Sequence, residues 1–153
     1  GRVREGDLVA LAAGVLADGY VAEVARTLPV GEPSDAARAL YRRRDDLWDR
    51  MIDACRPGRP AAALLAAYED SGEPLPAMPV AHGLGLGFDP PVVTPRLPET
   101  AAAETLEEGM VLALTGYVWE PGVGAVFTRD AVHVTSDGAE VLSTGPSWRD
   151  VRG

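Results

Sequence analysis

Residues 7–31 read DLVALAAGVLADGYVAEVARTLPVG, and this stretch decides the fold. Two runs rich in Val, Leu and Ala flank Asp18-Gly19, a dipeptide typical of a two-residue β-hairpin turn. The sequence therefore predicts antiparallel strands near residues 7–13 and 20–28. We expect this pair to pack under helices that follow it in the chain.

Two helices are predicted next, near residues 35–55 and 60–70. Ser34 is a suitable N-cap for the first, and Pro57 with Gly58 ends it. Apolar residues recur there at helical spacing: Ala37, Leu40, Tyr41, Leu47, Trp48, Met51, Ile52 and Cys55. We interpret the basic run at residues 42–44, beside two aspartates, as a solvent-facing part of this helix.

The remaining segments complete an α+β pattern. Residues 94–109 are polar and are interpreted as an irregular surface segment. Residues 109–144 predict two or three strands, with turns at residues 120–122 and 136–138. A hairpin, two helices and then antiparallel strands predict an α+β fold, and 153 residues are enough for one domain spanning 1–153.

Composition excludes several classes of partner. The 14 basic and 23 acidic residues give a formal net charge of −9, which disfavours nucleic acid. A lone cysteine, Cys55, excludes an intramolecular disulfide and suits a reducing compartment. No apolar run reaches the length needed to span a bilayer, and the first residues lack a signal-peptide pattern. We therefore expect a cytoplasmic protein with no membrane or nucleic-acid partner.

A second stretch, residues 81–93, reads AHGLGLGFDPPVV and marks a candidate site. It carries His82, one of only two histidines, followed by glycines at alternate positions. Glycine allows close backbone approach and positive φ, so this composition suits a functional loop. A purely structural turn has the same composition, so the motif alone does not distinguish a functional loop from a structural turn.

Four segments, in this order, resemble the pita-bread family of creatinase, methionine aminopeptidase, prolidase and aminopeptidase P. They are REGDLVALAAG, DGYVAEVARTLPVG, AHGLGLGFDPPVV and LEEGMVLALTGYVWEPGVGAVFTRDAVHVTSDGAEVLS. The second follows the family's pattern of a tyrosine, two residues, an acid and then an arginine–threonine pair. The resemblance implies a pita-bread α+β fold and, in the family's hydrolases, two divalent metals held by two aspartates, one histidine and two glutamates.

The resemblance places those five ligand positions at Ala12, Glu23, His82, Thr115 and Arg129. Ala12 has no ligand atom, Thr115 is neutral, and Arg129 is a permanent cation that repels metal. Glu23 and His82 alone cannot form the dinuclear cage. We therefore expect no metal and no cofactor, and we interpret the glycine loop as the remnant of a catalytic loop.

Candidate roles follow for the residues at these positions. The candidate catalytic residues are His82 as general base and Glu23 orienting it. The candidate substrate-binding residues are Arg129, Thr115, Asp89 and Tyr20. Two structural alternatives stay open: Glu23 and Arg129 form a salt bridge that fills the vacated metal site, and Asp89 caps the turn at Pro90-Pro91.

Three functions remain in competition. The first is a metal-free pseudo-peptidase that binds a peptide, small molecule or protein partner in the vestigial cleft. The second is a metal-independent hydrolase or lyase acting on a small C–N substrate through His82, and the third is a residual Xaa-Pro-type aminopeptidase. In the family a helix-and-strand segment precedes the first metal strand, which lies near the start of this chain. We therefore expect either a homo-oligomer or a missing N-terminal segment.

Overall fold

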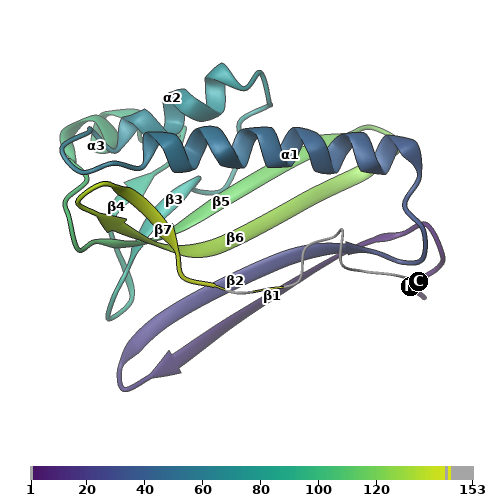
Figure 1. The fold of residues 1–153 in the computed structure, drawn as a ribbon, viewed down its shortest axis with the longest axis horizontal. Helices are drawn as coiled ribbons and strands as arrows, with labels where there is room; N and C mark the ends of the chain where they lie inside the picture. Colours follow the sequence, from purple (N-terminus) through teal and green to yellow (C-terminus); the bar gives the residue numbers. More distant parts are fainter. Residues whose placement is uncertain (1, 144, 146–153) are drawn as a thin grey trace.

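The strands of the computed structural model, which describes residues 2–143 and 145, form one antiparallel sheet (Figure 1). Its order is β1-β2-β6-β5-β3-β4, with β7 also pairing with β6. The elements are β1 (Leu8–Ala17), β2 (Tyr20–Pro29), α1 (Asp35–Ala54), α2 (Ala62–Asp70), β3 (Ala81–Leu84), β4 (Phe88–Val93), α3 (Pro98–Ala103), β5 (Val111–Glu120), β6 (Gly124–Thr135) and β7 (Gly138–Val141). The predicted α+β fold is confirmed, while residues 1, 144 and 146–153 of the predicted domain lie outside the described residues.

The predicted hairpin forms through a turn with positive φ at both central residues. Asp18 has φ 51° and Gly19 has φ 88°, as a two-residue turn of the primed type requires. Pairing runs from Ala17↔Tyr20 to Leu8↔Pro29. The first strand therefore ends four residues later than predicted, because Gly14–Ala17 keep the ladder intact up to the turn.

The expectation that this hairpin packs under the helices holds only at its open end, where Tyr41 of α1 donates to the Thr27 carbonyl at 3.0 Å and Leu8 packs against the core. Helix α1 crosses β5 and β6 and leaves the rest of β1 uncovered (Figure 1). On β1, Leu11 and Val15 are 58% and 61% exposed. The β1–β2 hairpin forms the outer end of the sheet. Helix α1 is not wide enough to cover both this hairpin and the β5–β6 pair.

The core lies between the helices and the β5–β6 half of the sheet. The N-cap of α1 is confirmed, because the Ser34 hydroxyl accepts a hydrogen bond from the Ala37 N–H at 3.2 Å. The helices bury one apolar face each against the sheet. Fully buried side chains there are Leu40, Tyr41, Leu47, Met51, Leu64, Tyr68, Leu112 and Leu114. Within the described residues, no helix combines the length and the apolar character needed to cross a membrane.

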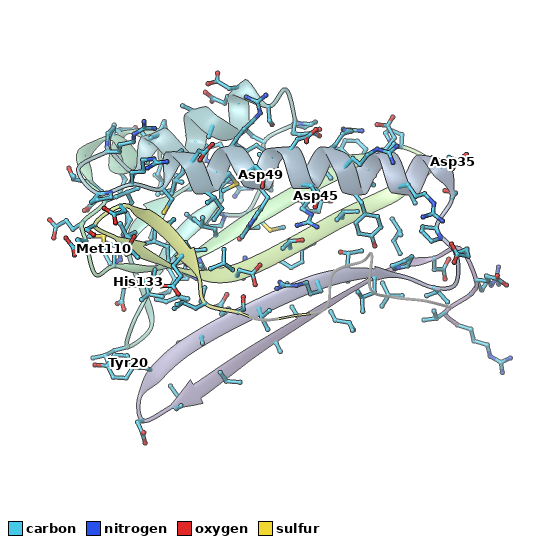
Figure 2. The ribbon with its side chains drawn as sticks, viewed as in Figure 1. Tyr20, Asp35, Asp45, Asp49, Met110 and His133 are labelled. Carbon is cyan, nitrogen blue, oxygen red and sulfur yellow. The ribbon has the colours of Figure 1, made fainter. Side chains whose placement is uncertain are left out.

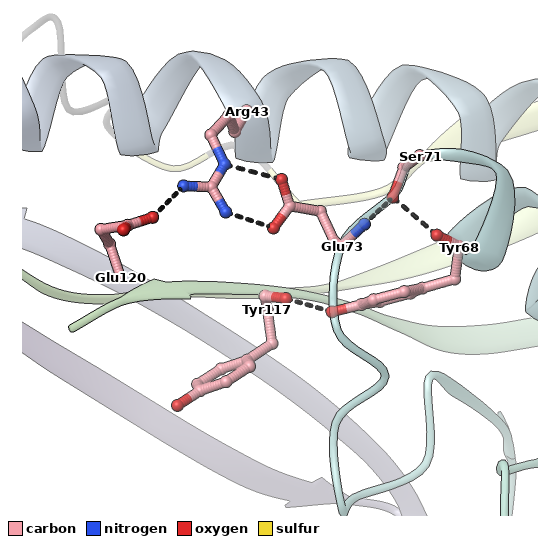
Figure 3. A network of polar contacts seen from close by, with 6 residues as sticks. All are labelled: Arg43, Tyr68, Ser71, Glu73, Tyr117 and Glu120. Carbon is pink, nitrogen blue, oxygen red and sulfur yellow. Dashed lines mark hydrogen bonds and ion pairs between the residues drawn. The ribbon is translucent and has the colours of Figure 1, made fainter.

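The basic run on α1 is not simply solvent-facing. The Arg43 guanidinium donates to both carboxylate oxygens of Glu73, each at 2.7 Å, and to Glu120 at 2.7 Å (Figure 3). The Tyr68 hydroxyl donates to the carbonyl of Tyr117 in the same region. Bidentate pairing of this kind is among the stronger surface ion pairs. Arg43 therefore ties α1 to the segment after α2 and to the end of β5.

Residues 81–93 form a β-hairpin, β3–β4, and not an open loop. His82 pairs with Val92 on one side and with Ala113 of β5 on the other. A Cβ at Gly83 would overlap the carbonyl oxygen of Pro90, so glycine is needed there for close strand approach. The segment predicted as irregular is also corrected, because residues 98–103 form α3 with proline in its first turn.

We predict that Leu47→Ala lowers the free energy of unfolding by about 2–5 kcal/mol through cavity formation. Leu47 is 0% exposed on the face of α1 that packs on the sheet. Thermal and chemical denaturation measure the change. Leu97→Ala is the matched control, since Leu97 is 52% exposed and its truncation leaves no cavity; equal losses in the two variants would contradict the assigned core.

Candidate functional site

The junction of β2 with β6 positions the candidate site. The ladder joins these strands at Ala25↔Arg129, and the Thr27 hydroxyl both donates to the Phe127 carbonyl at 3.0 Å and accepts from its N–H at 2.8 Å. Alternate residues of a strand share a face. Glu23 therefore lies on the same face as Ala25 and its partner Arg129.

The opposite face of the junction is fixed by Arg26. Its guanidinium donates to the carbonyls of Ala25 and Arg129, at 2.8 and 3.1 Å, and to the Asp130 carboxylate at 2.6 Å. The Ser143 hydroxyl also binds Asp130. Sequence reasoning noted Arg26 and Thr27 only as part of a family pattern, and their structural role is to hold the two halves of the sheet in register.

Arg129 lies at the centre of the site. It donates from Nη1 to Glu23 Oε2 at 2.6 Å and from Nε to Thr115 Oγ1 at 3.0 Å. Its guanidinium carbon is 5.4 Å from the centroid of the Phe127 ring, which is within cation–π range. The salt bridge weighed as a structural alternative is therefore present, and Thr115 belongs to the same unit.

His82 completes this cluster from β3. Its side chain is 2% exposed, and its Nε2 lies 3.8 Å from Glu23 Oε1, too far for a hydrogen bond. Neither ring nitrogen has a hydrogen-bond partner among the described residues. The ring stacks on Phe88 with centroids 4.0 Å apart. Phe88 was not identified from the sequence, although its position in the predicted glycine stretch offered a signal.

Burial governs the ionisation of His82. It lowers the pKa of the imidazole, and the Arg129 cation acts in the same direction. The Glu23 carboxylate acts against both and raises the pKa, without reversing the net shift. The imidazole is therefore neutral at neutral pH, and the charges of Glu23 and Arg129 compensate each other.

Ala12 joins the cluster through a shared depression of about 500 Å³. It pairs with Ala25, so it faces the same side as Arg129. Apart from Glu23 and Arg129, the lining is small or apolar: Ala12, Ala13, Gly14, Val15, Leu16, Val21 and Val24. The five positions lie close together, but only Ala12, Glu23 and Arg129 line the depression, while His82 and Thr115 are buried beside it. The result is a shallow, mostly apolar site with one compensated ion pair.

Asp89 and Tyr20 are not brought into this cluster. Phe88 stacks on His82, so Asp89, the next residue of β4, lies on the opposite face of the sheet. Tyr20 is the first residue after the β1–β2 turn and is 64% exposed at the hairpin tip (Figure 2). No contact within the described residues joins either side chain to Arg129. A substrate-binding role for them is not supported by their positions.

The donors present do not fit the dinuclear metal centre that the resemblance implies. Glu23 and His82 are the only usual metal donors at the five positions, and Arg129 lies 2.6 Å from the Glu23 carboxylate. Across residues 2–143 and 145, no three His, Cys, Asp or Glu side chains gather closely enough to hold a metal ion. Arg129 engages the carboxylate that a metal would need.

The fold and the site together define an α+β protein of the pita-bread class. The sequence profile of metallopeptidase family M24 matches residues 1–136, and the chain belongs to this family.

Individual relatives agree with this assignment. The chain is 28% identical over 149 residues to the Xaa-Pro dipeptidase of Pyrococcus furiosus and 29% identical over 148 residues to an uncharacterized peptidase of Staphylococcus aureus. Each alignment covers 93% of this chain but only 41% of the relative. The solved prolidase from Pyrococcus furiosus superposes with a TM-score of 0.83 at 27% identity, covering 96% of this chain and 44% of that one.

We predict opposite pKa changes for His82 in two variants. Arg129→Met removes a cation that lowers the pKa and should raise it, whereas Glu23→Gln removes an anion that raises the pKa and should lower it further. Proton NMR titration of the imidazole measures both, and His133→Asn assigns the two histidine signals. Shifts of the same sign in both variants would contradict the arrangement.

We also predict that the protein loses stability as the pH falls below about 6.5, the pKa of an unfolded histidine. The folded pKa of His82 lies lower, so the unfolded chain takes up this proton first. The contribution is at most about 1.4 kcal/mol per pH unit and ends below the folded pKa. Denaturant unfolding at several pH values measures it, and His82→Asn should flatten the slope.

Proposed function

We propose that this chain is a metal-independent member of the M24 family whose cleft binds a ligand. The observation that carries the proposal is the Arg129 side chain, hydrogen-bonded to Glu23 and Thr115 at the centre of the site. The cation satisfies the carboxylate that would otherwise attract a metal ion. The chain is, on this proposal, a pseudo-peptidase that keeps the cleft and not the metal chemistry.

Electrostatics makes the Arg129–Glu23 ion pair and a bound divalent metal mutually exclusive. A divalent ion about 4 Å from a guanidinium is repelled by roughly 8 kcal/mol at an effective dielectric constant of about 20. One carboxylate and one imidazole, Glu23 and His82, are left to offset that repulsion, and Glu23 is already paired. Metal binding would require Arg129 to leave the site.

The lining of the depression indicates the class of ligand. Arg129 and Glu23 compensate each other, so an uncharged polar group is favoured over a free ion. His82 is 2% exposed and is not among the residues that line this depression, so its imidazole does not define the ligand there. The Arg129 guanidinium donates and the Glu23 carboxylate accepts, so amide groups offer the complementary acceptor and donor, and Val15 and Val21 favour small apolar substituents beside them. A short peptide segment or an amide-bearing small molecule has this chemistry.

A second candidate function is metal-independent cleavage of a small C–N substrate. Buried His82, neutral at neutral pH and 3.8 Å from Glu23, has the ionisation state of a general base with a carboxylate to orient it. A modest movement of Glu23 would bring the two groups into hydrogen-bond range. Hydrolysis of small amides and ureas that is lost in His82→Asn would favour this function over binding alone.

We predict that the purified chain binds neither manganese nor zinc at this site and releases no amino acid from Xaa-Pro dipeptides, the substrates named for its Pyrococcus relative. Ala12→Asp, Thr115→Glu and Arg129→Glu together should be required before metal binds, because they restore three carboxylates and remove the cation. Titration calorimetry of both forms with each metal gives the result.

The control for this experiment is Ala12→Asp with Thr115→Glu, which adds carboxylates but keeps Arg129. It should bind metal at least tenfold more weakly than the triple variant. Tight binding by the unmodified chain, abolished by His82→Ala, would contradict the proposal and would favour a residual Xaa-Pro peptidase.

A further inference from the structure

The Phe88 ring covers one face of the His82 ring. The two rings are stacked, with an angle of 20° between their planes and centroids 4.0 Å apart. His82 is 2% exposed and Phe88 is 57% exposed. Among the described residues, the phenyl ring therefore lies outermost over a buried imidazole.

The buried imidazole has hydrogen-bonding capacity that the described residues do not use. Neither ring nitrogen has a partner among them, although buried polar groups in folded proteins nearly always have one. The nearest acid, Glu23, lies 3.8 Å from Nε2 and is bonded through its other oxygen to Arg129 at 2.6 Å. Glu23 and Arg129 both line the depression. His82 therefore lies directly behind one wall of the depression.

Few interactions hold the tip of the β3–β4 hairpin, the segment that leads into Phe88. Residues 85–87 connect the two strands, and the β3–β4 ladder shifts its register directly after His82. A hydrogen bond from the Val21 N–H to the Gly85 carbonyl, 2.9 Å long, ties the tip to β2. A Cβ at Gly87 would meet no atom within 4 Å, so packing does not require glycine there. Its contribution to the tip is backbone freedom.

We propose that Phe88 is a gate over His82. The structure holds the closed form; in the open form, Phe88 and residues 85–87 move outward and the imidazole becomes accessible beside Glu23. The open imidazole offers one donor and one acceptor to the amide groups of a ligand in the depression. Use of the gate by a ligand rests on the proposed function, whereas the gate itself does not.

The closed form is favoured, but opening is local. A stacked aromatic pair favours contact about two- to twelvefold beyond its buried area. Opening breaks this stack, exposes the apolar surface between the rings and strains one backbone hydrogen bond at the tip. The helices and the core beneath the β5–β6 pair are not disturbed. Opening of this kind requires far less free energy than global unfolding, as in other loops that control access to a site.

Chemical modification of the whole chain without a ligand is the first test. Diethyl pyrocarbonate acylates neutral imidazoles at neutral pH, and peptide mass spectrometry separates the two histidines. His133, whose side chain is 36% exposed, is the internal reference. His82 should react more slowly than His133, at a rate that low concentrations of denaturant do not change, because opening exposes little surface. A His82 rate that rises with denaturant in step with global unfolding would overturn the gate.

Variants of Phe88 give the second test. Phe88→Ala should raise the ratio of the His82 rate to the His133 rate at least tenfold, while Phe88→Tyr keeps the ring and should leave the ratio within about twofold. Tyr20→Ala is the matched control, because Tyr20 is an exposed aromatic residue at the neighbouring β1–β2 tip (Figure 2). Circular dichroism checks that each variant is folded. An unchanged ratio in Phe88→Ala, or an equal rise in Tyr20→Ala, would overturn the proposal.

Gly87→Ala tests the movement of the tip. The added methyl group makes no contact in the closed form but restricts the backbone when the tip is open, so the His82 rate should fall about two- to fivefold. An unchanged rate would contradict the outward movement of residues 85–87. These tests use no ligand, so a chain that passes them and binds no amide keeps the gate and loses the proposed function.

Discussion

The junction between β2 and β6 is the constraint on which the rest of the structure depends. One ladder pair, Ala25↔Arg129, joins the two halves of the sheet. Arg26 on one face and Thr27 on the other supply the hydrogen bonds that a longer ladder would otherwise make. Partly buried, charge-assisted bonds such as Arg26–Asp130 are stronger than exposed ones. Without this junction, Glu23 and Arg129 would belong to unconnected hairpins.

The geometry of the site and its chemistry have separate origins. The backbone places five positions from β1, β2, β3, β5 and β6 beside one another, as in the pita-bread fold at large. The side chains at those positions then determine what the cleft does. Here Arg129 donates to Glu23 and Thr115, so the site is held together by an internal ion pair. His82 remains buried and neutral beside it.

The two halves of the sheet also differ in how they are covered. Helices α1 and α2 bury one face of β5 and β6, and Arg43 secures that layer through Glu73 and Glu120. The β1–β2 hairpin has no such layer within the described residues, and its apolar side chains face outward. Because the site lies at the boundary between the halves, whatever covers β1 also shapes access to Arg129.

Sequence by itself determined the local elements and the family. The Asp18-Gly19 turn, the Ser34 cap and the helical spacing after it are set by interactions within a few residues, so they were predicted correctly. The resemblance also identified Glu23, His82, Thr115 and Arg129 as neighbours. It could not give their bonding, because a carboxylate and a guanidinium more than 100 residues apart in the chain meet only through the β2–β6 register.

Tertiary structure decided the rest. Only strand alternation within the β3–β4 hairpin shows that Asp89 faces away from His82 and that Phe88 stacks on it. Only the path of α1 shows that β5 and β6 are covered while β1 is not. Both outcomes depend on which faces and edges meet across the whole sheet, and period-two patterns in a single strand do not specify their partners.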